Sequence, residues 1–318
     1  MNYQNLCKLV FFLSKNARIK TKELGRLLNM SQQNISYNIK KLQADGIIKS
    51  YNAVIDPSKF GYVNIILFLN YKNFNAKTTN SIKKYLIENP NVVRIEETVE
   101  GSDLLIEYCV PNLSYFNKQH KEFMYAFNES VQLVESYVVI VKHNYTKNYL
   151  HKRFAERTQL IISGDRDPIS LDEKQIFILR EIVSNPIIPI VKIAEKYNLD
   201  PKTIRNNIKF LERKNIIRKY SIVFNHEALD ITREFIFLSL APEKLEDEKK
   251  FMEFCNLQKN IVTVTKVLGK YDILITSERL DKEPSIIKEL RKQFKVINYR
   301  ILTSDNIVKH NFLPENID

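Results

Sequence analysis

Residues 16–42 read NARIKTKELGRLLNMSQQNISYNIKKL, and the same pattern returns without a gap at residues 185–211 as NPIIPIVKIAEKYNLDPKTIRNNIKFL. An Ile-Ile pair and a Tyr follow each stretch at the same spacing, and both copies close with Val-Lys-His-Asn and an aromatic residue. Self-similarity at one fixed offset is the signature of a duplicated unit. The chain of 318 residues is therefore expected to contain two copies of one two-part unit.

The first part of each copy has the apolar periodicity of three short helices. In the first copy one apolar stripe runs over 3–14, a second helix begins near Thr21, and a third follows the N-cap residue Ser31. Asp200 holds the corresponding N-cap position in the second copy. Gly25 is small enough to let the second and third helices cross closely. Two helices joined by a three-residue turn behind a leading helix predict a helix-turn-helix.

After the third helix, residues 46–55 alternate in the manner of a β-hairpin, which would form the wing of a winged helix. The second part of each copy changes to the two-residue period of strands. Its expected elements follow the order strand, helix, strand, strand, helix, strand, which predicts a ferredoxin-like fold. They are 63–69, 77–88, 92–99, 103–110, 113–128 and 131–142 in the first copy, and 234–241, 244–257, 261–268, 272–277, 282–293 and 295–302 in the second.

Two helices cover only one face of a four-stranded sheet, yet strands such as 138–141 and 235–238 are apolar throughout. The second face therefore needs a cover, and the other copy is the obvious one. We expect an α+β fold in which the two sheets pack together as an intrachain pseudo-dimer. The expected domains are two winged helix-turn-helix units at 1–60 and 171–230, two ferredoxin-like units at 61–145 and 231–318, and a polar connector at 146–170.

The composition is that of a globular protein with excess positive charge. Hydrophobic residues make up 44% of the chain and charged residues 27%, and the net charge is +12. Residues 1–60 contribute +7 and residues 171–230 contribute +3 of that excess. Charge concentrated in the two helix-turn-helix blocks predicts a pair of modules that bind a polyanion. Since no apolar run approaches the roughly 20 residues of a membrane span, we expect a cytoplasmic protein with no membrane partner.

The stretch from residue 16 to residue 62, which ends in QADGIIKSYNAVIDPSKFGY, resembles the winged helix of the Lrp/AsnC (feast/famine) transcriptional regulators. The block that follows, with its Gly-x-x-Asp hairpin, resembles the RAM effector-binding domain of that family. The resemblance covers 1–145 and 171–318. It implies a prokaryotic regulator that binds double-stranded DNA and responds to a small effector such as an amino acid. Members usually carry one unit per chain and dimerise, so this chain looks like a tandem member, with further association into a homo-oligomer open.

The third helix of each copy carries polar and basic residues opposite its buried stripe. In a major groove, Gln and Asn can pair bidentately with adenine, and Arg with guanine. The candidate base-reading residues are Gln32, Gln33, Ser36, Tyr37 and Lys40 in the first copy and Lys202, Arg205, Asn206 and Lys209 in the second. The candidate phosphate contacts are Lys41, Lys49, Arg213 and Arg218. A solvated polar face is the alternative interpretation. Because the two helices differ, one chain is expected to read two unlike half-sites.

Four residues match the hairpin at which, by the resemblance, effectors bind between RAM units. They are Gly101 and Asp103 in the first copy and Gly269 and Asp272 in the second. The first copy has one residue fewer between its Gly and its Asp. The alternative is a structural turn in which the Asp side chain caps backbone amides.

His143 and His310 recur in the closing motif, but two histidines without a carboxylate or cysteine at ligand spacing make a poor metal site. Cys7, Cys109 and Cys255 are spread too widely for a local thiolate site. We therefore expect no metal ligands, no catalytic residues and no cofactor, and place the histidines at strand ends or in an interface.

Two other functions compete with the regulator hypothesis. Siroheme decarboxylases of haem synthesis also resemble this family, and His226 stands where they carry a histidine before a Leu-Gly pair. Here Glu-Ala-Leu-Asp follows that histidine, and the chain contains no Trp. A RAM-type interaction scaffold without DNA binding is the other alternative. The basic character of both reading helices favours the regulator.

Overall fold

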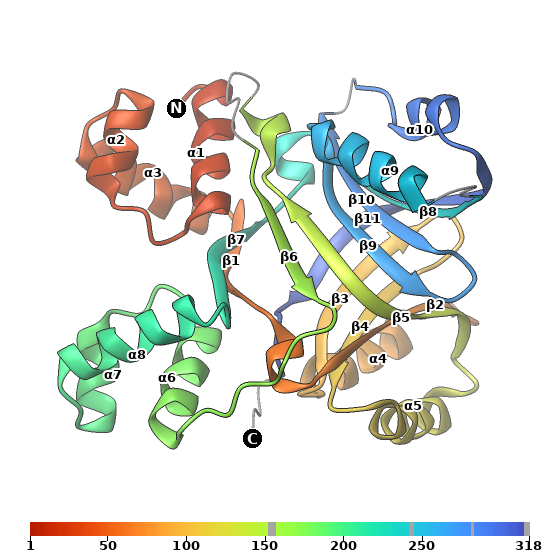
Figure 1. Cartoon of the computed structure of the whole chain (residues 1–318), viewed down its shortest axis with the longest axis horizontal. Helices are drawn as coiled ribbons and strands as arrows, with labels where there is room; N and C mark the ends of the chain where they lie inside the picture. Colours follow the sequence, from red (N-terminus) through yellow and green to blue (C-terminus); the bar gives the residue numbers. More distant parts are fainter. Residues whose placement is uncertain (152–156, 242–244, 281–282, 315–318) are drawn as a thin grey trace.

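A computed structural model describes residues 1–151, 157–241, 245–280 and 283–314. Two helix-turn-helix units lie at one end of the molecule, and a large curved β-structure flanked by helices forms the other end (Figure 1). A two-stranded ribbon lies between the two helix-turn-helix units (Figure 1). Among the described residues, none of the helices is long and apolar enough to cross a membrane.

Each helix-turn-helix unit contains three helices in the expected order. They are α1 (Tyr3–Lys15), α2 (Thr21–Leu28) and α3 (Gln32–Ala44) in the first copy, and α6 (Glu173–Ser184), α7 (Ile190–Tyr197) and α8 (Pro201–Arg213) in the second. The Ser31 side chain accepts a hydrogen bond from the Asn34 amide at 3.2 Å, so the N-cap prediction for α3 is confirmed. Asp200 holds the N-cap position of α8 without such a bond. The turn before α3 is tight, because a Cβ on Gly25 would lie 2.6 Å from the Met30 carbonyl oxygen.

The second part of each copy has the predicted ferredoxin-like order. The first copy contains β2 (Val63–Tyr71), α4 (Ala76–Glu88), β3 (Val92–Val99), β4 (Leu104–Val110), α5 (Leu113–Phe127) and β5 (Val131–Tyr145). The second contains β8 (Ile231–Leu240), α9 (Leu245–Leu257), β9 (Ile261–Leu268), β10 (Ile273–Leu280), α10 (Ile287–Gln293) and β11 (Val296–His310). The first residues of the helices expected at 244–257 and 282–293 lie outside the described residues. Within the copies the strand orders are β5-β2-β4-β3 and β11-β8-β10-β9, so the α+β prediction is confirmed.

The last strand of each copy is longer than predicted, because it continues into the other copy. Strand β5 pairs with β2 through residues 131–138 and then with β9 through 138–144. Strand β11 pairs with β8 through 296–303 and then with β3 through 303–310. These two crossings close eight strands into a ring. The sequence placed the strand ends at 142 and 302, since the partners of the remaining residues are more than a hundred positions away.

The inner faces of the two sheets form a shared apolar core, as the sequence predicts. Ile66, Phe68 and Leu105 of the first copy pack against Phe235 and Phe237 of the second, and all five side chains are buried. The rings of Phe68 and Phe237 meet edge to face, with centroids 5.0 Å apart. The two halves of the chain therefore cover each other's second sheet face.

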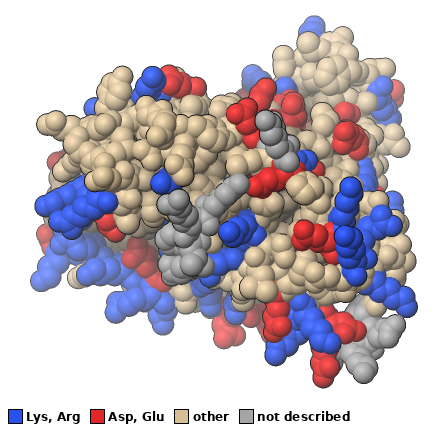
Figure 2. Space-filling model, turned by 90° about the horizontal axis from the view of Figure 1, so that it is seen from above, with Lys and Arg blue, Asp and Glu red and all other residues tan. Residues whose placement is uncertain are grey.

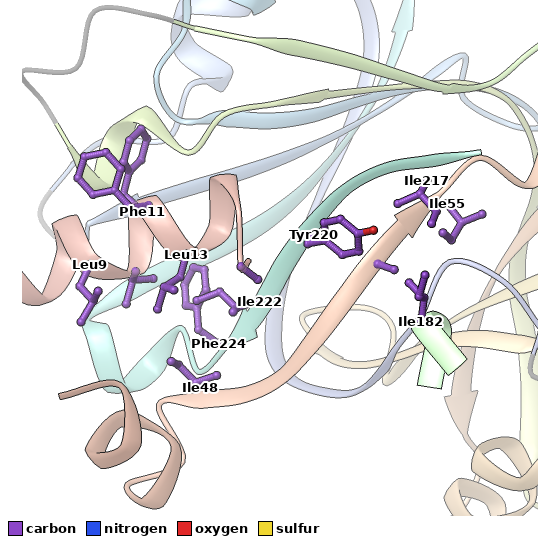
Figure 3. Close-up of a cluster of buried hydrophobic side chains, with 14 of the residues drawn as sticks. Leu9, Phe11, Leu13, Ile48, Ile55, Ile182, Ile217, Tyr220, Ile222 and Phe224 are labelled. Atoms are coloured by element: carbon purple, nitrogen blue, oxygen red, sulfur yellow. The ribbon is translucent and has the colours of Figure 1, made fainter. Parts of the chain in front are cut away.

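The predicted wing hairpin over 46–55 is wrong. Those residues form a single strand, β1 (Ile48–Ile55), which pairs antiparallel with β7 (Ile217–Phe224) of the other copy. Helix α1 packs against β7, and α6 against β1. Figure 3 shows Leu13 of α1 close to Ile222 and Phe224, and Ile182 of α6 close to Ile55. Alternation of apolar residues predicts a strand but does not identify its partner, and here the partner is distant in sequence.

The connector contributes a strand of its own. Strand β6 (Gln159–Ser163) pairs with residues 141–145 of β5, so the polar connector contains a strand that the sequence analysis did not predict. The Asp56 side chain fixes this region by accepting bonds from the Ser163 amide at 2.9 Å and the Ser58 amide at 3.2 Å. Residues 152–156 of the connector lie outside the described residues. Three short 3-10 helices complete the fold: η1 (Pro57–Phe60), η2 (Asn148–Leu150) and η3 (Glu227–Leu229).

The shared core predicts a large loss of stability when one of its rings is removed. Phe68→Ala is expected to lower the free energy of unfolding by about 3–5 kcal/mol, because it deletes a fully buried side chain between the sheets. Tyr125→Ala is the control, since that ring is 77% exposed on α5. Urea unfolding followed by circular dichroism measures both. Equal losses in the two variants would contradict the shared core.

Candidate nucleic-acid interface and effector sites

The outer face of α3 presents most of the residues predicted to read bases. Ile35 and Leu42 on the inner face are buried, which fixes the rotation of the helix. The opposite side chains are exposed, except for Ser36, which is half-buried; they line a shallow hollow together with Ser31. The residues of this face are Gln32, Gln33, Ser36, Tyr37, Lys40 and Lys41. Tyr37 is 65% exposed, so a large aromatic ring stands free on the surface.

The outer face of α8 is the counterpart in the second copy and is more basic. Ile204, Ile208 and Leu211 are buried on its inner face. The predicted residues of the outer face are all exposed: Lys202, Arg205, Asn206, Lys209 and Arg213. We call these eleven outer residues of α3 and α8 the reading surface. Both helices lie at the same end of the molecule (Figure 1), and Lys and Arg gather at that end in the view from above (left in Figure 2).

Two predicted phosphate contacts lie apart from the reading surface. Lys49 is on β1, where its ammonium group donates to the Asn306 side chain of β11 at 2.6 Å. Arg218 is half-buried on β7, where burial lowers its pKa and the nearby Asp56 carboxylate partly opposes that shift. Lys49 stays exposed on β1, whereas Arg218 is half-buried on β7, and a phosphate contact through either residue stays a prediction.

The two predicted effector carboxylates both cap backbone amides. The Asp103 side chain accepts a hydrogen bond from the Tyr71 amide at 2.7 Å, and the Asp272 side chain accepts one from the Leu240 amide at 3.3 Å. These amides stand at the end of the first strand in each ferredoxin-like unit. The geometry is that of the structural-turn interpretation, while an effector role for these carboxylates stays a prediction.

The two predicted hairpin glycines lie where the copies touch each other. Gly101 has a φ of +112°, and its carbonyl oxygen accepts a hydrogen bond from the Arg300 guanidinium of β11. A Cβ on Gly269 would lie 2.5 Å from the ring of Tyr137 and 2.9 Å from the carbonyl oxygen of Ser136 on β5. Each hairpin therefore contacts the last strand of the other copy, and Gly269 is required by this close approach.

A groove of about 710 Å³ borders the second hairpin at Asp272. It has charged groups of both signs and an apolar part that includes residues of both copies. The charged residues are Asp247, Glu248, Lys250, Lys266, Asp272 and Lys295, and the apolar ones include Ile140, Leu240, Leu268 and Phe294. Only Asp272 of this set was predicted from the sequence. Ile140 comes from the other copy, so no local sequence signal identifies the groove.

The histidines are held by other protein groups. Burial lowers the pKa of His310 well below its usual value, and its backbone carbonyl accepts a hydrogen bond from Asn52 at 2.6 Å. His143 contacts the Gln159 amide at 2.5 Å, and His226 contacts the Glu278 carboxylate at 3.0 Å. In the described part of the chain, no group of three His, Cys, Asp or Glu side chains is arranged to hold a metal ion.

The comparisons with known proteins agree with the duplicated architecture. A family model described as winged helix-turn-helix DNA-binding matches residues 5–49 and 171–218, one match in each copy. The regulator FL11 of Pyrococcus furiosus is 26% identical over 110 residues, which are 35% of this chain and 72% of FL11. A second, uncharacterised helix-turn-helix regulator of that organism is 28% identical over 147 residues, 45% of this chain and 94% of the relative. These two relatives thus match between a third and a half of the chain.

A third relative, the regulator LrpB of Bacillus subtilis, is 42% identical over 55 residues, 17% of this chain and 37% of LrpB. Among solved structures, the siroheme decarboxylase NirDL has a TM-score of 0.58 and covers 98% of this chain and 94% of its own, at 14% identity. The similarity covers both copies, and at 14% identity it is a similarity of fold alone. The family model thus matches a winged helix-turn-helix in each copy, and these three relatives are named as helix-turn-helix transcriptional regulators, one of them LrpB.

Proposed function

We propose that this chain is a DNA-binding transcriptional regulator that uses both of its reading helices on one duplex. The observation that carries the proposal is the pair of third helices, α3 and α8, exposed at the same end of a fold whose two copies pair through β1–β7 and the crossing strands. Each follows a helix-turn-helix turn and presents cationic side chains outward. Positive charge on exposed helices is what phosphate contacts require, and Gln, Asn and Arg supply base contacts.

The two helices differ in chemistry, which supports unlike half-sites. The first offers amide, hydroxyl and phenol groups through residues such as Gln33, Ser36 and Tyr37, whereas the second offers Arg205, Asn206 and Lys209. A homodimer reads a palindrome because its helices are identical, and a tandem chain is free of that constraint. We propose half-sites about one helical turn, roughly 10 base pairs, or a multiple of it apart.

The effector is proposed to bind in the groove beside Asp272. A free amino acid carries both charges, and the groove offers lysines such as Lys250 and carboxylates such as Glu248 beside apolar walls. A regulator of Neisseria meningitidis with a related fold has been solved as a complex with L-Met. A volume of about 710 Å³ lies within the roughly 300–1,000 Å³ of small-molecule sites.

The decarboxylase alternative finds little support at His226. Its imidazole contacts the Glu278 carboxylate, and the cavity that it borders measures about 100 Å³. Small-molecule sites commonly enclose roughly 300–1,000 Å³, and a tetrapyrrole is a large ligand among these. NirDL has been solved with an iron-uroporphyrin III analogue, but its likeness to this chain is one of fold at low identity. The regulator is therefore the function that the site favours.

Selection of bound fragments from genomic DNA is expected to return two unlike half-sites. Arg205→Ala should cost roughly 1–3 kcal/mol of binding free energy and relax the preference at one guanine, because a bidentate contact is lost. Electrophoretic mobility shifts measure the affinity, and repeated selection measures the preference. Affinity for DNA should also fall steeply with salt, since phosphate contacts release counterions.

Lys288→Ala on α10 is the matched control, because it removes an exposed cation far from the reading surface and should leave affinity and preference unchanged. Perfect palindromes from the selection would refute unlike half-sites. An equal loss for every sequence would show that Arg205 contacts phosphate only. No binding to DNA even at low salt would favour the interaction scaffold over the regulator.

A thermal-shift screen of the free amino acids is expected to find at least one ligand. At a hundredfold excess over its dissociation constant, such a ligand stabilises the folded state by about 2.7 kcal/mol, which raises Tm by several degrees. Ala241→Trp should abolish the shift, because the new ring fills the groove. Ala76→Trp, at the exposed start of α4, is the control. A shift retained by Ala241→Trp would place the effector elsewhere.

A further inference from the structure

A second cavity of about 100 Å³ lies between the β1–β7 ribbon and the eight-stranded ring. Its walls come from β1, β5, β7, β8, β9 and β11, so both copies build it. It shares no residue with the reading surface or with the groove beside Asp272. Any role for this cavity is therefore independent of the function proposed above.

The polar lining of this cavity is cationic. It contains two lysines, one arginine, two histidines, and hydroxyl and amide groups, and among the described residues that line it there is neither Asp nor Glu. The polar residues are Asn52, Asn144, Lys147, Lys219, Ser221, His226, Arg233, Thr263 and His310. A lining rich in donors and lacking carboxylates is the chemistry of an anion site.

Two carboxylates, Glu96 and Glu278, lie next to the lining residues without lining the cavity themselves. Both already accept bonds from cationic side chains. Glu278 bonds to Lys147, Arg233 and His226. Burial alone would raise the pKa of Glu278, yet these neighbours hold it well below its usual value. Glu96 accepts from the Nε of Arg233 at 2.8 Å and is likewise ionised. Neither carboxylate has capacity left to neutralise a further cation.

The buried charges do not balance. Arg94 also bonds to Glu96, with Nε to Oε2 at 2.8 Å, and it pairs at 3.8 Å with a third buried carboxylate, Glu107, which Lys142 contacts at 2.8 Å. With Lys142 and Lys219 included, five cations face the three carboxylates Glu96, Glu107 and Glu278, which leaves two surplus positive charges. Buried charge without a counter-charge is costly, so the surplus favours an anion in the cavity.

Two donors on opposite walls are without a partner. The ammonium group of Lys219, on β7, makes no hydrogen bond or ion pair with any described residue. Burial, together with repulsion from Lys147, lowers its pKa to about 8. The side-chain amide nitrogen of Asn144, on β5, is buried and also lacks a partner among the described residues. One bound oxyanion would satisfy both groups, and β5 and β7 would then be linked through it.

The volume limits the ligand to a small one. One water takes about 30 Å³ in the liquid, so the cavity has room for about three waters or one tetrahedral oxyanion. We propose that the cavity binds a small dianion of the size and charge of phosphate, held by Lys219 of the ribbon and by Asn144 and Arg233 of the ring. The two surplus charges match the two charges of the ligand.

The test is a phosphate titration of the full chain by thermal denaturation at constant ionic strength, with sulfate and malonate as further arms. Phosphate stabilises folded proteins without specific binding as well, so the comparison between variants isolates the site. The wild type should show a saturating rise in Tm of several degrees above that background. If sulfate acts like phosphate and malonate does not, the site selects a tetrahedral oxyanion; an equal response to malonate would overturn that part of the proposal.

Lys219→Met should abolish the saturating rise and, without phosphate, should be as stable as the wild type or more stable, because a repelled buried cation is gone. Asn144→Ala should weaken the response and covers the case in which Lys219→Met fails to fold. Lys288→Met, an exposed lysine on α10, should behave as the wild type. Parallel responses of the wild type and Lys219→Met, or no saturating response in the wild type, would overturn the proposal.

Discussion

The pairing of β5 and β11 with both sheets is the constraint on which the rest of the structure depends. Each strand begins as the edge of its own ferredoxin-like sheet and ends as the neighbour of a strand from the other copy. The pairing satisfies the edge hydrogen bonds of β3 and β9, which would otherwise be open to another chain. It also brings the inner sheet faces together over Phe68 and Phe237.

The same crossing fixes the helix-turn-helix units. Residues just before the ring form β1 and β7, and their pairing places each strand of the ribbon against the leading helix of the other copy. The Ser221 hydroxyl donates to the Ser14 carbonyl at 2.8 Å, and the Ala17 amide donates to the Tyr220 carbonyl at 3.0 Å. Neither unit is therefore a domain on a loose linker. The position of α3 relative to α8 is a property of the whole fold.

Local signals predicted the local structure well. The helices of both copies, the N-cap at Ser31 and the need for a small residue at Gly25 follow from side chains within a few positions of each other. The duplication and the apolar second faces also predicted that the sheets would cover each other, because an exposed apolar face needs a partner. The outer faces of α3 and α8 were predicted from the same periodicity. Once the buried stripe of a helix is known, the residues on its exposed face are known as well.

The features that sequence reasoning missed all depend on contacts between distant residues. Residues 46–55 alternate as a strand should, but only the fold shows that the partner is β7. Lys49 is exposed as expected, but it also bonds to Asn306, 257 positions away, a contact that no local pattern indicates. The charge imbalance around Lys219 is equally nonlocal, because its neighbours come from several strands of both copies. Periodicity identifies faces, and it does not identify which faces meet.

The covalent link between the halves has a consequence for how such a protein can vary. In an assembly of identical subunits, one codon change alters every subunit, and dilution separates the partners. Here a change in α3 leaves α8 as it was, and the effective concentration of each half around the other is set by the chain itself. The base preference at one half-site can therefore change in evolution while the preference at the other half-site is retained. Because the two halves are covalently linked, a half from a related protein does not replace one of them.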